Sequence, residues 1–275
     1  MAVPSPSAVP DRDRWAWWGN STAIAGIVIK EMYRRKDSYV LFILTALLTL
    51  VVGSVNFFNE ENIVRLVKET CLQLIWISSI VITVTTAARQ IPAERENRTI
   101  FPLLAKPVTR PQVVLGKFLG CWFACGLTLV AFYTFFVIVS GAREHSWPLV
   151  PYFQMLMMHW WMLGILTAMT LLGSVVFAAP SSNITITVIV TAGIFLIARK
   201  LNVLALGQPE PMQSLIYAIY FTVPHLALFD LRDYIIHERG VIAWLPWLGA
   251  FLYAAVYTAI FLILTCLAFR RKALN

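Results

Sequence analysis

The chain has 275 residues, of which 59% are hydrophobic and only 13% are charged. Soluble domains average about 25% charged residues, so this composition excludes a water-soluble globular protein and predicts an all-α polytopic membrane protein. A net charge of +8 is also typical of nucleic-acid-binding proteins, but here the basic residues gather at the ends of apolar runs. No motif that reads nucleic acid is present, so we expect no nucleic-acid partner.

The sequence of the N-terminal region predicts a tail followed by an amphipathic helix. Residues 1–20 begin with a stretch rich in Pro, Ser and Ala, and we expect them to form a flexible tail. Residues 21–38 can form a helix that lies along the inner membrane surface, because its apolar and charged residues separate onto two faces. These faces carry Ile24, Ile27, Val28 and Met32 on one side, and Lys30, Arg34 and Asp37 on the other.

Long apolar runs predict six membrane-spanning helices, each needing about 20 residues to cross the hydrocarbon. Their expected ranges are 39–58, 70–88, 118–142, 154–179, 183–198 and 241–269. The break at residues 179–183 separates the fourth span from the fifth, within a stretch that has no Asp, Glu, Lys or Arg. Gly116, Gly120 and Gly126 offer places where another helix can approach closely.

The outer segment 199–240 competes for membrane status, because residues 212–229 are uncharged and nearly long enough to cross. With six spans, residues 1–38, 89–117 and 270–275 hold 15 of the 22 basic residues and 6 of the 14 acidic ones. The positive-inside rule then favours six spans over seven, with both termini and the tail 270–275 in the cytoplasm. Because Pro224 interrupts the uncharged stretch, we expect a re-entrant or surface-lying helical pair on the outer side.

The longest strongly charged segment is the cytoplasmic loop 89–117, which has six basic and two acidic residues. Pro92 is expected to start a short helix with acidic residues in its first turn, where the helix dipole favours them. Thr109 is expected to cap the helix that continues into the third span. Between them, residues 99–104 form an apolar knob bounded by prolines. Such a knob, held between two rigid helices, can transmit force, although an ordinary loop would also carry charges and turn residues.

The sequence shows no catalytic or cofactor-binding pattern. The pair Gly116-Lys117 resembles part of a phosphate loop, but Pro111 stands where the first glycine belongs and Phe118 where the hydroxyl belongs. Hydrolase motifs and the cysteine spacing of a zinc site are also absent. His159 is expected at the membrane interface rather than as a metal ligand. We therefore expect no enzyme activity, cofactor or metal site in this chain.

The charged loop resembles the loop between the second and third spans of type 2 ABC exporter permeases. That class includes permeases similar to the one for nitrous oxide reductase maturation. The matching residues are Glu94, Glu96, Arg98, Thr99, Leu103, Leu104, Pro107, Arg110, Gly116 and Lys117. The helix with Lys30, Glu31 and Arg34 resembles the elbow helix of that class, and residues 223–231 resemble a segment before its last span. Asn97 departs from the pattern, in which a glycine often stands at this position.

The resemblance implies the permease subunit of an exporter in the bacterial inner membrane. Two permeases, identical or different, would pair among membrane lipids, and a separate cytoplasmic ABC ATPase would bind ATP and Mg and dock on the loop. Glu94, Glu96 and Arg98 would then make polar contacts with the ATPase. A groove in the ATPase would receive Ile100, Phe101 and Leu104, with Thr99, Leu103, Pro107 and Arg110 completing the coupling segment.

Three alternatives stay open beside the exporter interpretation. The chain could transmit force from an ABC ATPase to an envelope machine without passing a substrate. It could also be a membrane enzyme that acts on lipids, although that would need a charged or metal-binding cluster that the sequence does not show. A structural membrane anchor is the third alternative. Substrate identity and transport direction do not follow from the residues.

Overall fold

The computed structural model describes residues 12–34, 36–54, 60–96, 109–207 and 209–271. They are helical and contain no strand. The helices are α1 (Arg12–Arg34), α2 (Asp37–Ser54), α3 (Glu60–Ala88), α4 (Pro92–Glu96), α6 (Arg110–Glu144), α7 (Leu149–Val176), α8 (Pro180–Leu206), α9 (Met212–Thr222), η1 (Leu226–Phe229), α10 (Arg232–Ile236) and α11 (Trp244–Arg271).

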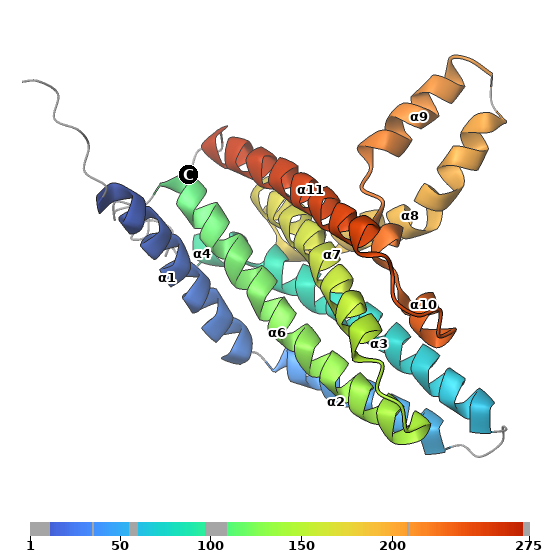
Figure 1. The fold of residues 1–275 in the computed structure, drawn as a ribbon. Helices are drawn as coiled ribbons and strands as arrows, with labels where there is room; N and C mark the ends of the chain where they lie inside the picture. Colours follow the sequence, from blue (N-terminus) through green and yellow to red (C-terminus); the bar gives the residue numbers. More distant parts are fainter. Residues whose placement is uncertain (1–11, 35, 55–59, 97–108, 208, 272–275) are drawn as a thin grey trace, which may run out of the picture.

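The centre of the fold is a bundle in which α3, α6, α7 and α11 run side by side (Figure 1). At one end, which we call the α4 end, α4 lies with the start of α6 and the end of α11. At the opposite end, the α10 end, α10 lies with the start of α3 and the connection between α6 and α7. The hairpin of α8 and α9 extends away from the bundle.

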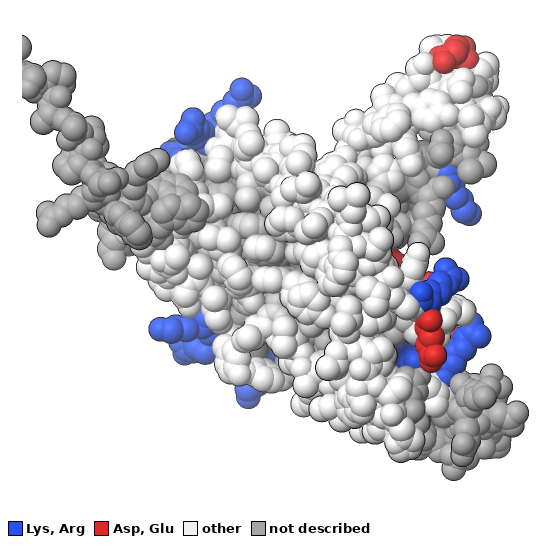
Figure 2. All heavy atoms as spheres, viewed as in Figure 1, with Lys and Arg blue, Asp and Glu red and all other residues white. Residues whose placement is uncertain are grey.

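Four helical stretches of the described ranges are long and apolar enough to cross a membrane. They are Val64–Glu94, Arg110–Ala142, Leu149–Val176 and Trp244–Arg271. In Figure 2 a broad surface of the bundle is uncharged, and Lys, Arg, Asp and Glu appear at its borders. This distribution fits a multi-pass protein whose sides contact lipid and whose ends contact water.

The other expected spans are less regular. Met212–Thr222 and Leu226–Ile236 pass the same test only as a pair bent by 42°, which agrees with a break at Pro224. The expected first and fifth spans lie in α2 and α8, whose apolar parts Tyr39–Val51 and Pro180–Leu196 have 10–17 residues each. The total of six spans therefore stays a prediction, whereas the multi-pass helical architecture is confirmed.

Helix α1 packs along α6 through small residues. Gly116 and Gly120 leave room for α1: a Cβ added at Gly120 would lie 2.7 Å from the Val28 Cβ and 2.9 Å from the Ala25 carbonyl oxygen. Ile24, Val28 and Met32 are buried, whereas Ile27 is 62% exposed. Val28 and Met32 follow Ile24 at four-residue steps, whereas Ile27 lies beyond the edge of this stripe.

Two tryptophans join α6 to α7 in a nearly symmetric arrangement. The Trp122 indole nitrogen donates to the Trp160 carbonyl at 3.0 Å, and the Trp160 nitrogen donates to the Trp122 carbonyl at 3.1 Å. Their rings stack with centroids 4.7 Å apart. Each ring covers a glycine of the other helix, Gly126 or Gly164. At Gly126, one of the positions where the sequence predicts a close helix approach, the Trp160 side chain fills the space.

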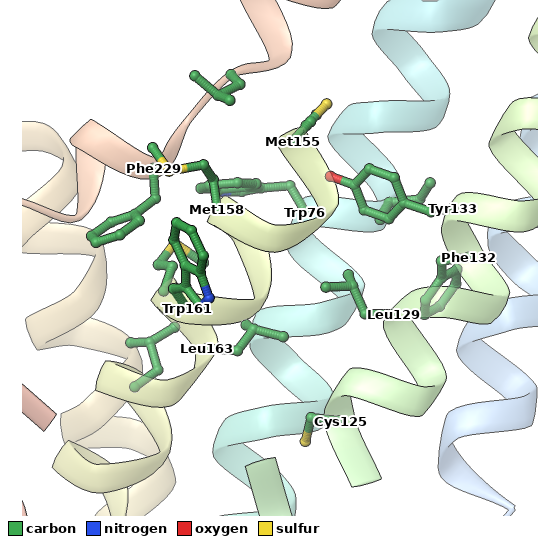
Figure 3. Close-up of a cluster of buried hydrophobic side chains, with 14 of the residues drawn as sticks. Trp76, Cys125, Leu129, Phe132, Tyr133, Met155, Met158, Trp161, Leu163 and Phe229 are labelled. Atoms are coloured by element: carbon green, nitrogen blue, oxygen red, sulfur yellow. The ribbon is translucent and has the colours of Figure 1, made fainter. Parts of the chain in front are cut away.

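The main core lies where α3, α6 and α7 meet η1. Figure 3 shows aromatic and sulfur-containing side chains from these elements pointing toward one another. Phe132 and Phe229 are fully buried, and Met155 and Leu163 fill the space on α7. Methionine adapts to irregular gaps, which suits the meeting point of straight helices with the bent segment after α9. This core fixes the two ends of the bundle relative to each other.

Candidate functional site

The segment that leads from α3 into α4 forms as the sequence predicts. Pro92 begins α4, and Glu94 lies in its first turn. Residues 89–91 connect it to α3 through a turn in which the Ala93 amide donates to the Arg89 carbonyl at 3.0 Å. On the far side of the loop, Thr109 is the N-cap of α6, and its amide donates to the Gln112 side-chain oxygen at 2.6 Å. Hydrogen-bonded helical structure therefore borders the expected coupling segment on both sides, in α4 and at the start of α6.

A buried cation ties α4 to α6. Lys117, on the second turn of α6, is only 3% exposed, and its Nζ lies 2.7 Å from the Glu94 carboxylate. The same Nζ donates to the backbone oxygen of Gln90 at 2.9 Å and is 3.4 Å from the Gln90 side-chain oxygen. A buried ammonium is costly unless it is paired and hydrogen-bonded, and these three oxygens supply that compensation. Through Lys117, α3, α4 and α6 are joined at one point.

Arg110 joins the start of α6 to the end of α11. Its Nη1 donates to the carbonyl of Phe269 at 2.7 Å and to that of Arg270 at 3.1 Å. The guanidinium also lies over the Phe269 ring, 5.6 Å from its centroid. The last carbonyls of a helix have no partner within the helix and carry partial negative charge, so a guanidinium is a suitable cap. Arg110 therefore adds the last helix to the α4 end.

Replacing Arg110 with alanine is expected to fray the last turn of α11, because two carbonyls lose a charged donor. Each such hydrogen bond contributes about 1.5–3 kcal/mol. Hydrogen exchange followed by mass spectrometry should show faster exchange in residues 262–271. Arg271→Ala provides the control, since Arg271 is an exposed arginine on the same turn. Equal exchange in the two variants would contradict the capping role of Arg110.

The other predicted site residues belong either to the coupling segment or to the elbow helix. The described part of the chain excludes Arg98, Thr99, Ile100, Phe101, Leu103, Leu104 and Pro107, as well as the side chain of Glu96. Lys30, Glu31 and Arg34 lie on α1 with exposed side chains. Glu94 is 22% exposed, so its carboxylate contacts Lys117 and still reaches solvent.

Sequence reasoning missed the partners of Lys117 and Arg110. Both residues were recognised as part of the loop pattern, but nothing in their spacing names Gln90 or the carbonyls of α11. One signal was available for Lys117: it lies among apolar residues at the start of a span, where a lysine needs a partner. The partner itself depends on how α3 and α11 pack against α6.

A second polar cluster lies inside the bundle around His159, which is fully buried rather than at the membrane interface as expected. Its Nε2 is 2.8 Å from the Ser79 hydroxyl, and its Nδ1 is 3.2 Å from the Tyr133 hydroxyl. The Trp76 ring contacts it in a tilted arrangement with centroids 4.3 Å apart, and the guanidinium of Arg232 lies 4.8 Å from the Trp76 centroid. Both ring nitrogens have hydrogen-bond partners, so His159 is a buried polar residue whose hydrogen bonds are made within the core.

Arg232 ties the bent segment after α9 to α3. Its guanidinium pairs with Asp230 through two contacts of 2.8 Å and also donates to Gln73. In the described ranges, no three His, Cys, Asp or Glu side chains come together as a possible metal site. The arrangement is suited to holding helices together at both ends of the bundle.

The chain matches a known protein family over most of its length. The family model described as ABC-2 family transporter protein matches residues 25–274, which is nearly the whole chain. A search of the curated proteins found no match.

Proposed function

We propose that this chain, which belongs to the ABC-2 family of transporter proteins, is the permease subunit of an exporter driven by a separate ATPase that docks on residues 89–117. Members of this family are the membrane components of transporters and are not themselves ATPases. Its permeases normally work with a separate ABC ATPase. A membrane subunit that depends on another protein for its energy needs a surface that receives force, and the α4 end has the features of such a surface.

The observation that carries this proposal is the buried Lys117. A push on α4 is transmitted to α3 through residues 89–91 and to α6 through the contact of Lys117 with Glu94. The ion pair is short and its Lys117 end is buried, so salt screens it less than a fully exposed pair and it can transmit force between the helices. The two helices on either side of the loop would then move together when the ATPase closes.

Movement of α3 would change a groove on the side of the bundle. This groove of about 460 Å³ lies between α3, α8 and the segment η1 to α10. Its walls are mostly apolar and include Trp76 and Phe195, with Arg232 and Asp230 as the charged residues that line it. Because α3 carries α4 at one end and lines this groove along its side, a tilt of α3 would widen or narrow it. We place the path of an amphipathic cargo here, between this chain and a second permease.

The charge distribution supports a cytoplasmic α4 end. Described basic residues at this end include Lys117, Arg110, Arg270 and Arg271, against Glu94. The positive-inside rule assigns the more basic end to the cytoplasm. At the α10 end the cations pair with nearby acids, as in Arg239 with Asp233. Location in a bacterial inner membrane, pairing with a second permease and the resemblance to the nitrous oxide reductase maturation group stay predictions.

Charge reversal of Glu94 and Glu96 together tests the proposal. In cells that contain the partner ATPase, E94K/E96K should lose co-purification of the ATPase and the ATP hydrolysis that the permease stimulates. Because E94K also places two cations together, the swap E94K/K117E is the matched control, since it restores an ion pair of opposite polarity.

The two variants separate folding from docking. If Glu94 acts only inside the permease, E94K/K117E should recover ATPase binding, whereas a direct contact with the ATPase predicts that binding stays impaired. Full binding and full activity in E94K/E96K would overturn the proposed docking site. Transport of cargo by reconstituted vesicles then distinguishes an exporter from a subunit that only transmits force.

A further inference from the structure

A half-enclosed pocket of about 390 Å³ lies at the α10 end, far from α4. Three segments that are distant in sequence form it: α3, the connection from α6 into the first turn of α7, and α10 with the residues that follow it. Its walls include Lys68, Trp147, Pro148, Tyr152, Tyr234 and Glu238. A pocket of this size is in the range that encloses small organic molecules.

The polar centre of the pocket is Lys68. Its side chain is 3% exposed, and its Nζ lies 3.3 Å from the Glu238 carboxylate. A lysine this deeply buried needs anionic or hydrogen-bonding neighbours to offset its lost hydration. Lys68 therefore gives the pocket a fixed site for negative charge.

Glu238 differs from Lys68 in being 75% exposed. Its backbone has φ of 50°, a left-handed conformation that residues other than glycine rarely adopt. Hydrogen bonds on both sides hold this turn, from the Glu238 amide to Ile235 and from the Arg239 amide to Tyr234. The exposed carboxylate can turn into solvent without a desolvation cost, so a competing anion can replace it at Lys68.

The remaining walls are aromatic and apolar. Tyr152 is 4% exposed and shares a hydrogen bond of 3.1 Å with Ser140, so its ring has a fixed position. Trp147 is 53% exposed and Tyr234 is 39% exposed, and both present ring surface at the pocket. Such rings favour a flat apolar body next to the cationic site.

We infer that this pocket binds an organic anion with a small aromatic or apolar body, whose acidic group replaces Glu238 at Lys68. Glu238 then acts as a built-in competitor that occupies the cation when no ligand is present. The inference does not depend on an ATPase, because the pocket lies at the opposite end from α4 and is complete within one chain.

The probe is 4-(trifluoromethyl)benzoate, with 4-(trifluoromethyl)benzamide as its neutral counterpart, added to the full chain in nanodiscs of zwitterionic lipid. Fluorine NMR line broadening should show saturable binding of the benzoate and none of the amide. Glu238→Gln should tighten benzoate binding by about two- to fivefold, the range that an exposed ion pair covers. Lys68→Met should weaken it by about tenfold or more, because the charged partner is lost.

Asp233→Asn is the matched control for Glu238→Gln. Asp233 is an exposed carboxylate on α10 that pairs with Arg239 and does not line the pocket. If D233N raised the benzoate affinity as much as E238Q does, the effect would come from the general loss of negative charge, and the inference would be overturned. So would unchanged binding in E238Q, or benzamide binding as strong as benzoate binding. Because Glu238 is exposed, E238Q keeps the test decisive even where Lys68→Met lowers stability.

Discussion

Replacing Glu94 with alanine is expected to destabilise the α4 end more than any other single truncation there. Among the described residues, the substitution leaves Gln90 as the hydrogen-bond partner of the buried Lys117 ammonium. Removing one partner of a buried pair costs about 3–5 kcal/mol, and the partial exposure of Glu94 places the effect near the lower limit. Thermal unfolding in detergent should show a lower melting temperature, and hydrogen exchange should accelerate in residues 89–96.

The double variant E94A/K117M is the control for this prediction. Methionine keeps the apolar stem of the lysine and removes the charge, so it should restore most of the lost stability. The difference between the effect of the double variant and the sum of the two single effects gives the interaction free energy of the ion pair. Equal destabilisation in E94A and in E94A/K117M would contradict the role assigned to this contact.

Replacing Gly120 with leucine is expected to separate α1 from α6. The new Cβ would lie 2.7 Å from the Cβ of Val28 and 3.0 Å from the Cα of Ala25, so rigid parts of α1 would have to move. Overpacking of this kind costs about 1–3 kcal/mol, and backbone contacts favour the upper part of that range. Thermal unfolding should show a clear fall in melting temperature, and protease should cut α1 more readily.

Gly26→Leu provides the comparison on α1 itself, because nothing lies within 4 Å of a Cβ at Gly26. Leucine is a better helix former than glycine by about 0.5–1 kcal/mol, so this variant should be neutral or slightly stabilised. If the melting temperatures of G26L and G120L fell by the same amount, close packing at Gly120 would not be what holds α1 against α6.

The local signals in the sequence predicted the local structure well. Pro92 starts α4, Thr109 caps α6, and the break before Pro180 ends one helix and begins the next. Each of these features depends on residues within one or two turns, where proline, a capping side chain or an uncharged turn acts directly on the backbone. These local signals were therefore enough to predict where α4 begins and where α6 is capped.

The contacts between helices could not be predicted in the same way. The contacts of Lys117 with Gln90 and of Arg110 with the end of α11 depend on how the helices pack. No periodic pattern in the sequence indicates either contact. His159 shows the same limit, since its neighbours Ser79 and Tyr133 come from two other helices.

The bent segment after α9 combines both situations. Its break at Pro224 follows from proline chemistry, and η1 and α10 follow in short pieces. What holds it against the bundle is the contact of Arg232 with Asp230, Gln73 and Trp76, which joins distant parts of the chain. The sequence thus indicated where the chain bends, and packing determined where the bent part lies.

Photo-crosslinking in native membranes tests most directly the claim that the α4 end receives an ATPase. A photoreactive amino acid would replace Phe101 in the coupling segment, and in a parallel sample it would replace the exposed Tyr234 at the α10 end. The account predicts that Phe101 forms an adduct with a protein whose tryptic peptides contain a phosphate-loop sequence, and that Tyr234 does not. An ATPase adduct from Tyr234, with none from Phe101, would contradict it.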